Sequence, residues 1–209
     1  MMILALEFSS ARRSVALARS GTLLAEAVEP TGGRGTDAFG LIEKVLENGK
    51  VSREEIEIIA VGLGPGSYTG IRAAIAVAQG WQLARGTKLL GVSSMDSLAA
   101  QAQAENFFGR VNVAVDAQRG EYYLAVWDIS GKSRVEISAL KIVPAAEIAV
   151  RQAAGEICVG PELKPVVLPS AAMVVSLAAG RTDFVPGDRL MPVYLRETSF
   201  VKAPAGRMV

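Results

Sequence analysis

Histidine is absent from this chain of 209 residues. Without it, the chain cannot form a Ser-His-Asp or Cys-His catalytic arrangement or offer a histidine ligand to a metal ion. It also has no side chain whose unperturbed pKa lies near neutrality. Lysine, aspartate, glutamate and tyrosine could still transfer protons. The composition therefore excludes the commonest catalytic sites without excluding catalysis.

Three further features are scarce: cysteine, a charge excess and long apolar runs. A single cysteine, Cys158, cannot form an internal disulfide, which favours a reducing, cytoplasmic location, and its apolar surroundings in "EICVG" predict burial. The 22 basic and 21 acidic residues give a net charge of +1, so no basic excess predicts direct RNA binding. The opening "MMILALEFSS" reaches Glu7 after a run too short for a signal peptide or membrane span. We expect a soluble protein with no membrane segment.

What the sequence does contain is the same order of elements twice. Short apolar runs at 2–8, 14–19 and 22–28 predict three strands, followed by a helix at 37–48 capped by Thr36 or Asp37. A strand at 57–61 and a helix ending near residue 85 complete the pattern βββαβα. The second half repeats it from residue 111, with Pro144 and Ser170 opening its two helices. We therefore predict two α/β lobes, 1–106 and 107–209, and leave open that the C-terminal tail packs back on the first lobe.

Two tandem βββαβα lobes are the plan of the actin-like ATPase (ASKHA) superfamily. In that fold a nucleotide lies between the lobes and the first hairpin contacts its phosphate. By this analogy Glu7, Ser9 and Asp116 are candidates for a weak nucleotide site. Fold does not settle function, so the analogy supplies an alternative to be tested.

The most distinctive stretch is "GLGPGSYTGIR". Its conspicuous positions are Gly62, Gly64, Pro65, Gly66, Ser67, Thr69, Gly70 and Arg72. The P-loop template fails because no lysine occurs between Lys50 and Lys88, and the dinucleotide template G-x-G-x-x-G fails in both possible registers. The loop precedes a helix that Ser67 or Thr69 can cap. The residues alone leave two interpretations: an anion site at a helix N-terminus, or glycines that let strand and helix pack closely.

Arg72 lies in the first turn of this helix, where a cation opposes the helix dipole at a cost of about 0.3–1 kcal/mol when exposed. We expect its charge to be paired with a carboxylate or a bound anion. Glu7 and Asp116, each at the end of the first strand of its lobe, are the candidate partners; the alternative is a solvated surface arginine.

The helix over 68–85 is apolar almost all round, whereas the helix at 37–48 has one apolar stripe. A helix that is apolar on every side is buried on more than one side. We expect the two helices to form an association surface that supports a homodimer. The expected outward-facing residues are Leu41, Val45, Ala73, Val77 and Trp81, although the sequence does not say which stripe faces inward.

The motif, together with the blocks "AVAQGWQLA", "GVSSMDSLA", "VDAQRGEYYLAVW" and "PVYLRETS", resembles the TsaB (YeaZ) family over nearly the whole chain. The glycine motif matches that family's G-x-G-P-G-S-[FY]-T-G-[LVI]-R at every defined position. Three features depart from the family pattern: Phe8 follows Glu7, no histidine opens the first helix, and "DAQRGE" replaces D-A-R-x-G-E. They weaken a ligand-binding role for the hairpins.

The resemblance implies an assembly subunit for the threonylcarbamoyladenosine modification of tRNA, with no catalytic or metal-binding residues of its own. It implies two partners, the catalytic paralogue TsaD, which carries a histidine metal motif, and the ATPase TsaE. It also implies indirect contact with tRNA and no cofactor beyond a weakly bound nucleotide at the complex interface. It favours packing against protein for the glycine loop. The alternative is an actin-like ATPase or kinase-like enzyme; a peptidase is disfavoured by the missing histidine and the lone buried cysteine.

Overall fold

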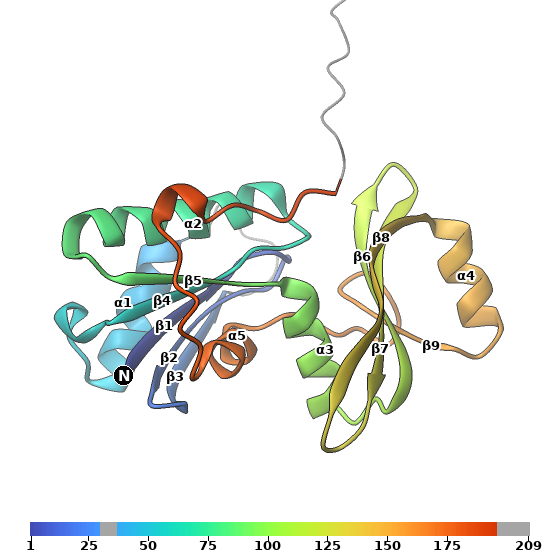
Figure 1. Cartoon of the computed structure of the whole chain (residues 1–209), viewed down its shortest axis with the longest axis horizontal. Coiled ribbons are helices and arrows are strands. Elements are labelled where there is room, and N and C mark those ends of the chain that lie inside the picture. Colours follow the sequence, from blue (N-terminus) through green and yellow to red (C-terminus); the bar gives the residue numbers. More distant parts are fainter. Residues whose placement is uncertain (30–36, 196–209) are drawn as a thin grey trace, which may run out of the picture.

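The computed structural model describes residues 1–29 and 37–195, which form two lobes side by side (Figure 1). The first lobe is built on a five-stranded sheet of order β3-β2-β1-β4-β5. Its strands are β1 (Met2–Glu7), β2 (Arg13–Arg19), β3 (Thr22–Glu29), β4 (Ile58–Gly62) and β5 (Lys88–Val92). The first three form an antiparallel meander, and β1, β4 and β5 run parallel. Candidate cap Thr36 lies outside the described residues; Asp37 caps the first helix instead, accepting from the Gly40 N–H at 2.9 Å.

Helices cover both faces of the first sheet. Helices α1 (Ala38–Gly49) and α2 (Tyr68–Arg85) pack on one face around the largest apolar core. Helix α5 (Ala171–Ala178), far along the chain, packs on the other. Every residue of β1 is buried because both faces are covered, which explains the unbroken apolar run of this strand.

The second lobe contains a four-stranded sheet of order β8-β7-β6-β9. Its strands are β6 (Gly109–Gln118), β7 (Glu121–Ile129), β8 (Arg134–Pro144) and β9 (Ile157–Val159). Helix α3 (Ser94–Ala104) packs on one face and α4 (Ala145–Ala153) on the other. The order βββαβα occurs in both halves, with β5 and α3 added between them. The protein therefore has the predicted actin-like fold.

The helices do not follow the boundary expected at residue 106. Helix α3 precedes that boundary but packs on the second sheet, and α5 follows it but packs on the first. The two helices also contact each other, joined where the Ser170 N–H donates to Ser97 Oγ at 3.3 Å. The boundary thus separates the strands of the two sheets but not their helices, because each sheet needs a cover on its second face.

After α5, residues 181–195 run back along the first lobe, and we call them the C-terminal strap. Val185 bridges β5 at Leu89, and the short 3₁₀ helix Gly187–Arg189 contacts α2. The Val193 N–H then donates to the Leu63 carbonyl at 2.9 Å. The strap therefore carries its last described residues to the glycine loop. In the described ranges, no helix combines the length and the apolar character needed to cross a bilayer.

Candidate functional site: the glycine loop and the outer face of α2

The glycines of the loop lie against protein. A Cβ on Gly66 would collide with the Ser9 carbonyl, and one on Gly70 with the Phe8 carbonyl. The Ser67 N–H donates to the Ser9 carbonyl at 2.6 Å, and Ser67 caps α2, a role open to Thr69 in the sequence. These contacts confirm that the glycines let backbone approach backbone. They also explain the glycine spacing without a bound anion.

The buried carboxylate of Glu7 lies beside the first residues of the loop, Gly62 to Gly64. Glu7 is fully buried, accepting from the Ser9 N–H at 2.8 Å and from Ser94 Oγ at 2.9 Å. Ser94 Oγ in turn accepts from the Gly64 N–H at 3.1 Å. Burial raises the pKa of Glu7 above its ordinary value, although the hydrogen bonds from Ser9 and Ser94 oppose the shift. A Cβ on Gly62 would also collide with this carboxylate, so Gly62 leaves room for Glu7.

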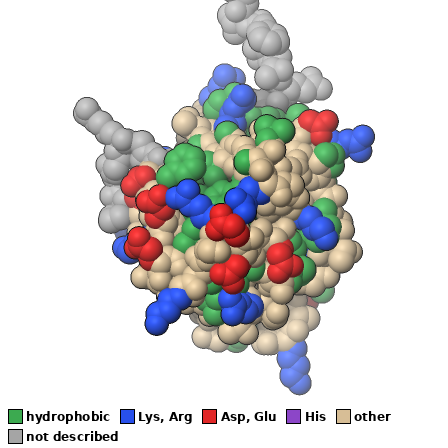
Figure 2. All heavy atoms as spheres, turned by 90° about the vertical axis from the view of Figure 1, so that its left-hand side faces the viewer, with side chains coloured by type: hydrophobic (Ala, Val, Ile, Leu, Met, Phe, Trp, Pro, Cys, Tyr) green, Lys and Arg blue, Asp and Glu red, His purple; other side chains and the backbone are tan. Residues whose placement is uncertain are grey.

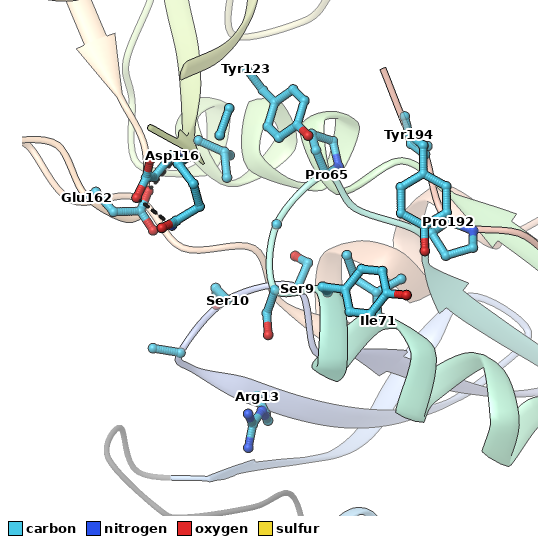
Figure 3. Close-up of a pocket in the computed structure, with 18 residues that line it drawn as sticks. Ser9, Ser10, Arg13, Pro65, Ile71, Asp116, Tyr123, Glu162, Pro192 and Tyr194 are labelled. Atoms are coloured by element: carbon cyan, nitrogen blue, oxygen red, sulfur yellow. Dashed lines mark hydrogen bonds between the residues drawn. The ribbon is translucent and has the colours of Figure 1, made fainter. Parts of the chain in front are cut away.

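A cavity of about 580 Å³ lies between the lobes, beside the glycine loop (Figure 3). Ser9, Pro65, Asp116 and Glu162 are among its lining residues, whereas Glu7 is not. Two of the three candidates for a nucleotide site are therefore brought together. The placement of Glu7 in that site is wrong, because its carboxylate is enclosed behind the loop.

Two carboxylates give the cavity an acidic wall. Glu162 Oε2 accepts from the Asp116 N–H at 3.2 Å. Burial raises the pKa of Glu162; this hydrogen bond opposes the shift and the nearby Asp116 charge adds to it. Gln118 bonds both carboxylate oxygens of Asp116, at 2.7 and 2.8 Å. Across the cavity, Arg13 forms an ion pair with Glu29 at 3.5 Å. This wall suits hydroxyl or cationic groups better than phosphate. Within the described residues, no three acidic or cysteine side chains cluster in a way that could hold a metal ion.

Arg72 is exposed at the first turn of α2 and contacts tyrosines. It donates to Tyr68 Oη at 2.7 Å, and its guanidinium lies 5.1 Å from the centre of the Tyr68 ring. Its contacts with these tyrosines, first of all a hydrogen bond with Tyr194, raise the pKa of Arg72 above its ordinary value. The expected pairing with Glu7 or Asp116 is wrong, since the first is buried and the second is held by Gln118. Tyr194, on the strap, was missed, although it lies within the block "PVYLRETS".

The inward and outward faces of α1 and α2 differ in part from expectation. Leu41 and Val45 are buried in the core of the first lobe, so their expected outward placement is wrong. Ala73, Val77 and Trp81 are half-buried, and the last two also pack against that core. The exposed stripe of α2, which we call the α2 stripe, consists of Arg72, Ala76, Gly80 and Leu83. Leu83 is 88% exposed, and Phe39 at the start of α1 is 63% exposed.

Among the described residues, the surface seen from the α1 side of the first lobe shows no basic patch. Figure 2 shows acidic and basic side chains interspersed over this end of the molecule. Oppositely charged side chains of the first lobe form ion pairs, such as Arg53 with Glu43 at 2.6 Å and Arg85 with Glu54 at 3.2 Å. Interspersed charges of both signs do not form the clustered positive surface that nucleic acids select.

Comparison with known proteins places the chain in a family. The family model of TsaD, tRNA N6-adenosine threonylcarbamoyltransferase, matches residues 37–163. The chain is 34% identical over 125 residues to the tRNA threonylcarbamoyladenosine biosynthesis protein TsaB of Escherichia coli, covering 60% of this chain and 54% of that protein. It is 29% identical over 128 residues to TsaB of Bacillus subtilis, covering 61% of this chain and 55% of that protein. The chain thus spans about half the length of the curated relatives it matches.

Two solved structures from Pseudomonas aeruginosa resemble most of the chain. The first, described as an uncharacterized protein with similarity to peptidase YeaZ, is 28% identical with a TM-score of 0.80. The second, YeaZ, is 25% identical with a TM-score of 0.77. Each match covers 93% of this chain and 99% of the solved one. From the glycine motif, the two-lobed fold and these matches together, we conclude that the chain belongs to the TsaB (YeaZ) family of tRNA threonylcarbamoyladenosine biosynthesis proteins.

Proposed function

We propose that this protein is an assembly subunit for the threonylcarbamoyladenosine modification of tRNA and has no catalytic activity of its own. It acts with the catalytic paralogue TsaD and the ATPase TsaE, forms a homodimer when alone, and contacts tRNA through its partners. Family membership supports the pathway, and the absence of histidine supports the division of labour, because this chain cannot supply a histidine metal site.

The observation that carries the proposal is the α2 stripe. One side of α2 packs on the sheet, while Ala76, Gly80 and Leu83 face outward without charge. Small residues on an exposed helix face let a second helix approach closely, and a specific interface needs about 1,200–2,000 Å² of buried surface. The half-buried flanks at Ala73, Val77 and Trp81 add to the area that a partner could cover.

Replacing Ala76 by glutamate tests this surface. Ala76 is exposed, so the lobe should fold. An interface formed on the stripe would bury the new carboxylate either alone or paired with Arg72 one turn earlier, and burial of the charge costs desolvation in both cases. We expect self-association and TsaD binding to weaken about a hundredfold or more, measured by sedimentation and titration calorimetry. Ala149→Glu, an exposed alanine on α4 of the second lobe, is the matched control. Unchanged association of a folded Ala76→Glu protein would place the interface elsewhere.

A second candidate function is an actin-like ATPase or kinase-like enzyme. It is favoured by the cavity of about 580 Å³ between the lobes, which Ser9 and Asp116 help to line. Calorimetric titration of the isolated chain with ATP distinguishes the two functions. Micromolar binding followed by turnover would support the enzyme, and absence of both would leave the assembly role.

A further inference from the structure

Three residues remain unexplained by the packing of the loop. Tyr68 and Arg72 belong to the glycine motif, yet both are exposed, and Tyr194 reaches them from the C-terminal strap. The two tyrosine rings lie with centroids 6.1 Å apart, and Tyr68 and Tyr194 are 59% and 51% exposed. We call these three residues the Arg72 cluster. Exposed tyrosine and arginine side chains held in one arrangement are typical of the residues that dominate binding at protein interfaces.

The cluster holds the Arg72 guanidinium but does not neutralise it. Tyr68 Oη takes one of its N–H donors at 2.7 Å, and a guanidinium carries five. Within residues 1–29 and 37–195, no carboxylate forms an ion pair with Arg72. The charge also opposes the dipole of α2. Tyrosine contacts fix the side chain in one orientation, which lowers the entropic cost of binding a partner group.

We propose that the carboxylate for Arg72 comes from a different protein, the catalytic partner of the assembly, and that the Arg72 cluster is the charged end of the docking surface. This inference rests on the proposed function. The partner group is an aspartate or glutamate flanked by apolar residues, because Arg72 is the only charged member of the α2 stripe. Docking desolvates the ion pair, so its loss weakens the complex more than the loss of an exposed pair does.

A second copy of this chain fits the cluster less well. In a two-fold dimer the same surface meets itself, and α2 contains two arginines and no acidic residue. Of the acidic residues of α1, Glu43 is already paired with Arg53 at 2.6 Å. A homodimer through α2 would leave the Arg72 charge without a carboxylate from the facing helix. A carboxylate supplied by the catalytic partner, and not by a second copy, would therefore make the Arg72 cluster favour that partner over self-association.

The test compares the full-length protein with its Arg72→Gln variant. Titration calorimetry against the purified catalytic partner should show binding weakened about thirtyfold or more. Sedimentation should show homodimerisation unchanged or tighter. Arg85→Gln, which removes the same charge from the same helix but from an internal pair with Glu54, should leave partner affinity unchanged. In Arg72→Glu, exchange of one partner aspartate or glutamate for lysine should restore binding.

Several outcomes would overturn the inference. If wild type binds the partner and Arg72→Gln binds equally well, the inference fails while the assembly role stands; if wild type binds no partner, the assembly role fails first. If Glu47→Gln weakens the homodimer as Arg72→Gln does, the carboxylate comes from a second copy. If Glu197→Gln alone reproduces the loss of partner binding, it comes from the same chain. If only tRNA binding by the assembled complex weakens, the counter-ion is a phosphate.

Discussion

Ser94 Oγ, at the start of α3, donates a hydrogen bond of 2.9 Å to Oε2 of Glu7, at the end of β1. The same hydroxyl accepts from the Gly64 N–H at 3.1 Å, so one side chain joins the first strand, the glycine loop and the helix that covers the second lobe. Glu7 is fully buried there, which makes the motif loop dependent on the protonation and geometry of one carboxylate.

The raised pKa of Glu7 predicts a specific pH dependence. The folded state holds the Glu7 proton more tightly than the unfolded state, so the free energy of unfolding falls as pH rises from the ordinary value of 4.5 through the higher folded pKa. Glu7→Gln removes this titration and should flatten the pH profile of stability above 4.5. Urea unfolding of both proteins across acidic to neutral pH measures it. Parallel profiles would show that Glu7 is not responsible.

Two glycines of α2 should respond oppositely to alanine. A Cβ on Gly70 meets the Phe8 backbone, whereas one on Gly80 meets nothing within 4 Å. We expect Gly70→Ala to destabilise the fold by roughly 1–3 kcal/mol through overpacking. Gly80→Ala should stabilise it by about 0.4–1 kcal/mol, because it restricts the unfolded chain. Denaturant unfolding at concentrations where the chain is monomeric gives both values. Equal effects would contradict the close contact between α2 and the backbone just after β1.

In the second lobe, Arg151 of α4 is hydrogen-bonded to a buried asparagine of β6. Arg151 donates to Asn112 Oδ1 at 3.0 Å and to Glu147 at 2.7 Å, and Asn112 is buried. Arg151→Ala should lower the free energy of unfolding by about 1–3 kcal/mol, because the buried Asn112 Oδ1 loses the arginine as hydrogen-bond donor.

Arg181 is the matched control, because its pair with Asp183 is exposed. Arg181→Ala should cost no more than about 1 kcal/mol. A similar loss for both variants in denaturant titrations would show that the buried amide contributes nothing.

The isolated chain should be catalytically inert. Incubated with ATP, threonylcarbamoyl-adenylate and tRNA, it should leave the tRNA unmodified by mass spectrometry of the digested nucleosides, because no histidine is present to build a metal site. When TsaD and TsaE are added to the same mixture, the tRNA should become modified. Modified nucleoside formed by this chain alone would contradict the assembly role.

The sequence by itself determined the elements and their order. Alternating or continuous apolar runs, capping residues such as Ser67 and Ser170, and turn residues act over a few neighbouring positions, so they can be recognised without knowing the fold. The density of glycine in the motif loop likewise predicted close approach, which the contacts of Gly66 and Gly70 with the backbone of Ser9 and Phe8, just after the first strand, confirm. The family followed from the same motif.

Only the tertiary structure decided which face each element presents and which distant residues meet. The sequence of α1 does not say whether Leu41 and Val45 face the sheet or solvent; the structure places both in the core. Helix α3 packs on the second sheet and α5 on the first, because each sheet has two faces to bury. Arg72 meets Tyr194, and Glu7 meets Ser94, across long separations in the chain. Such contacts depend on how the elements pack, and no local pattern of residues records that packing.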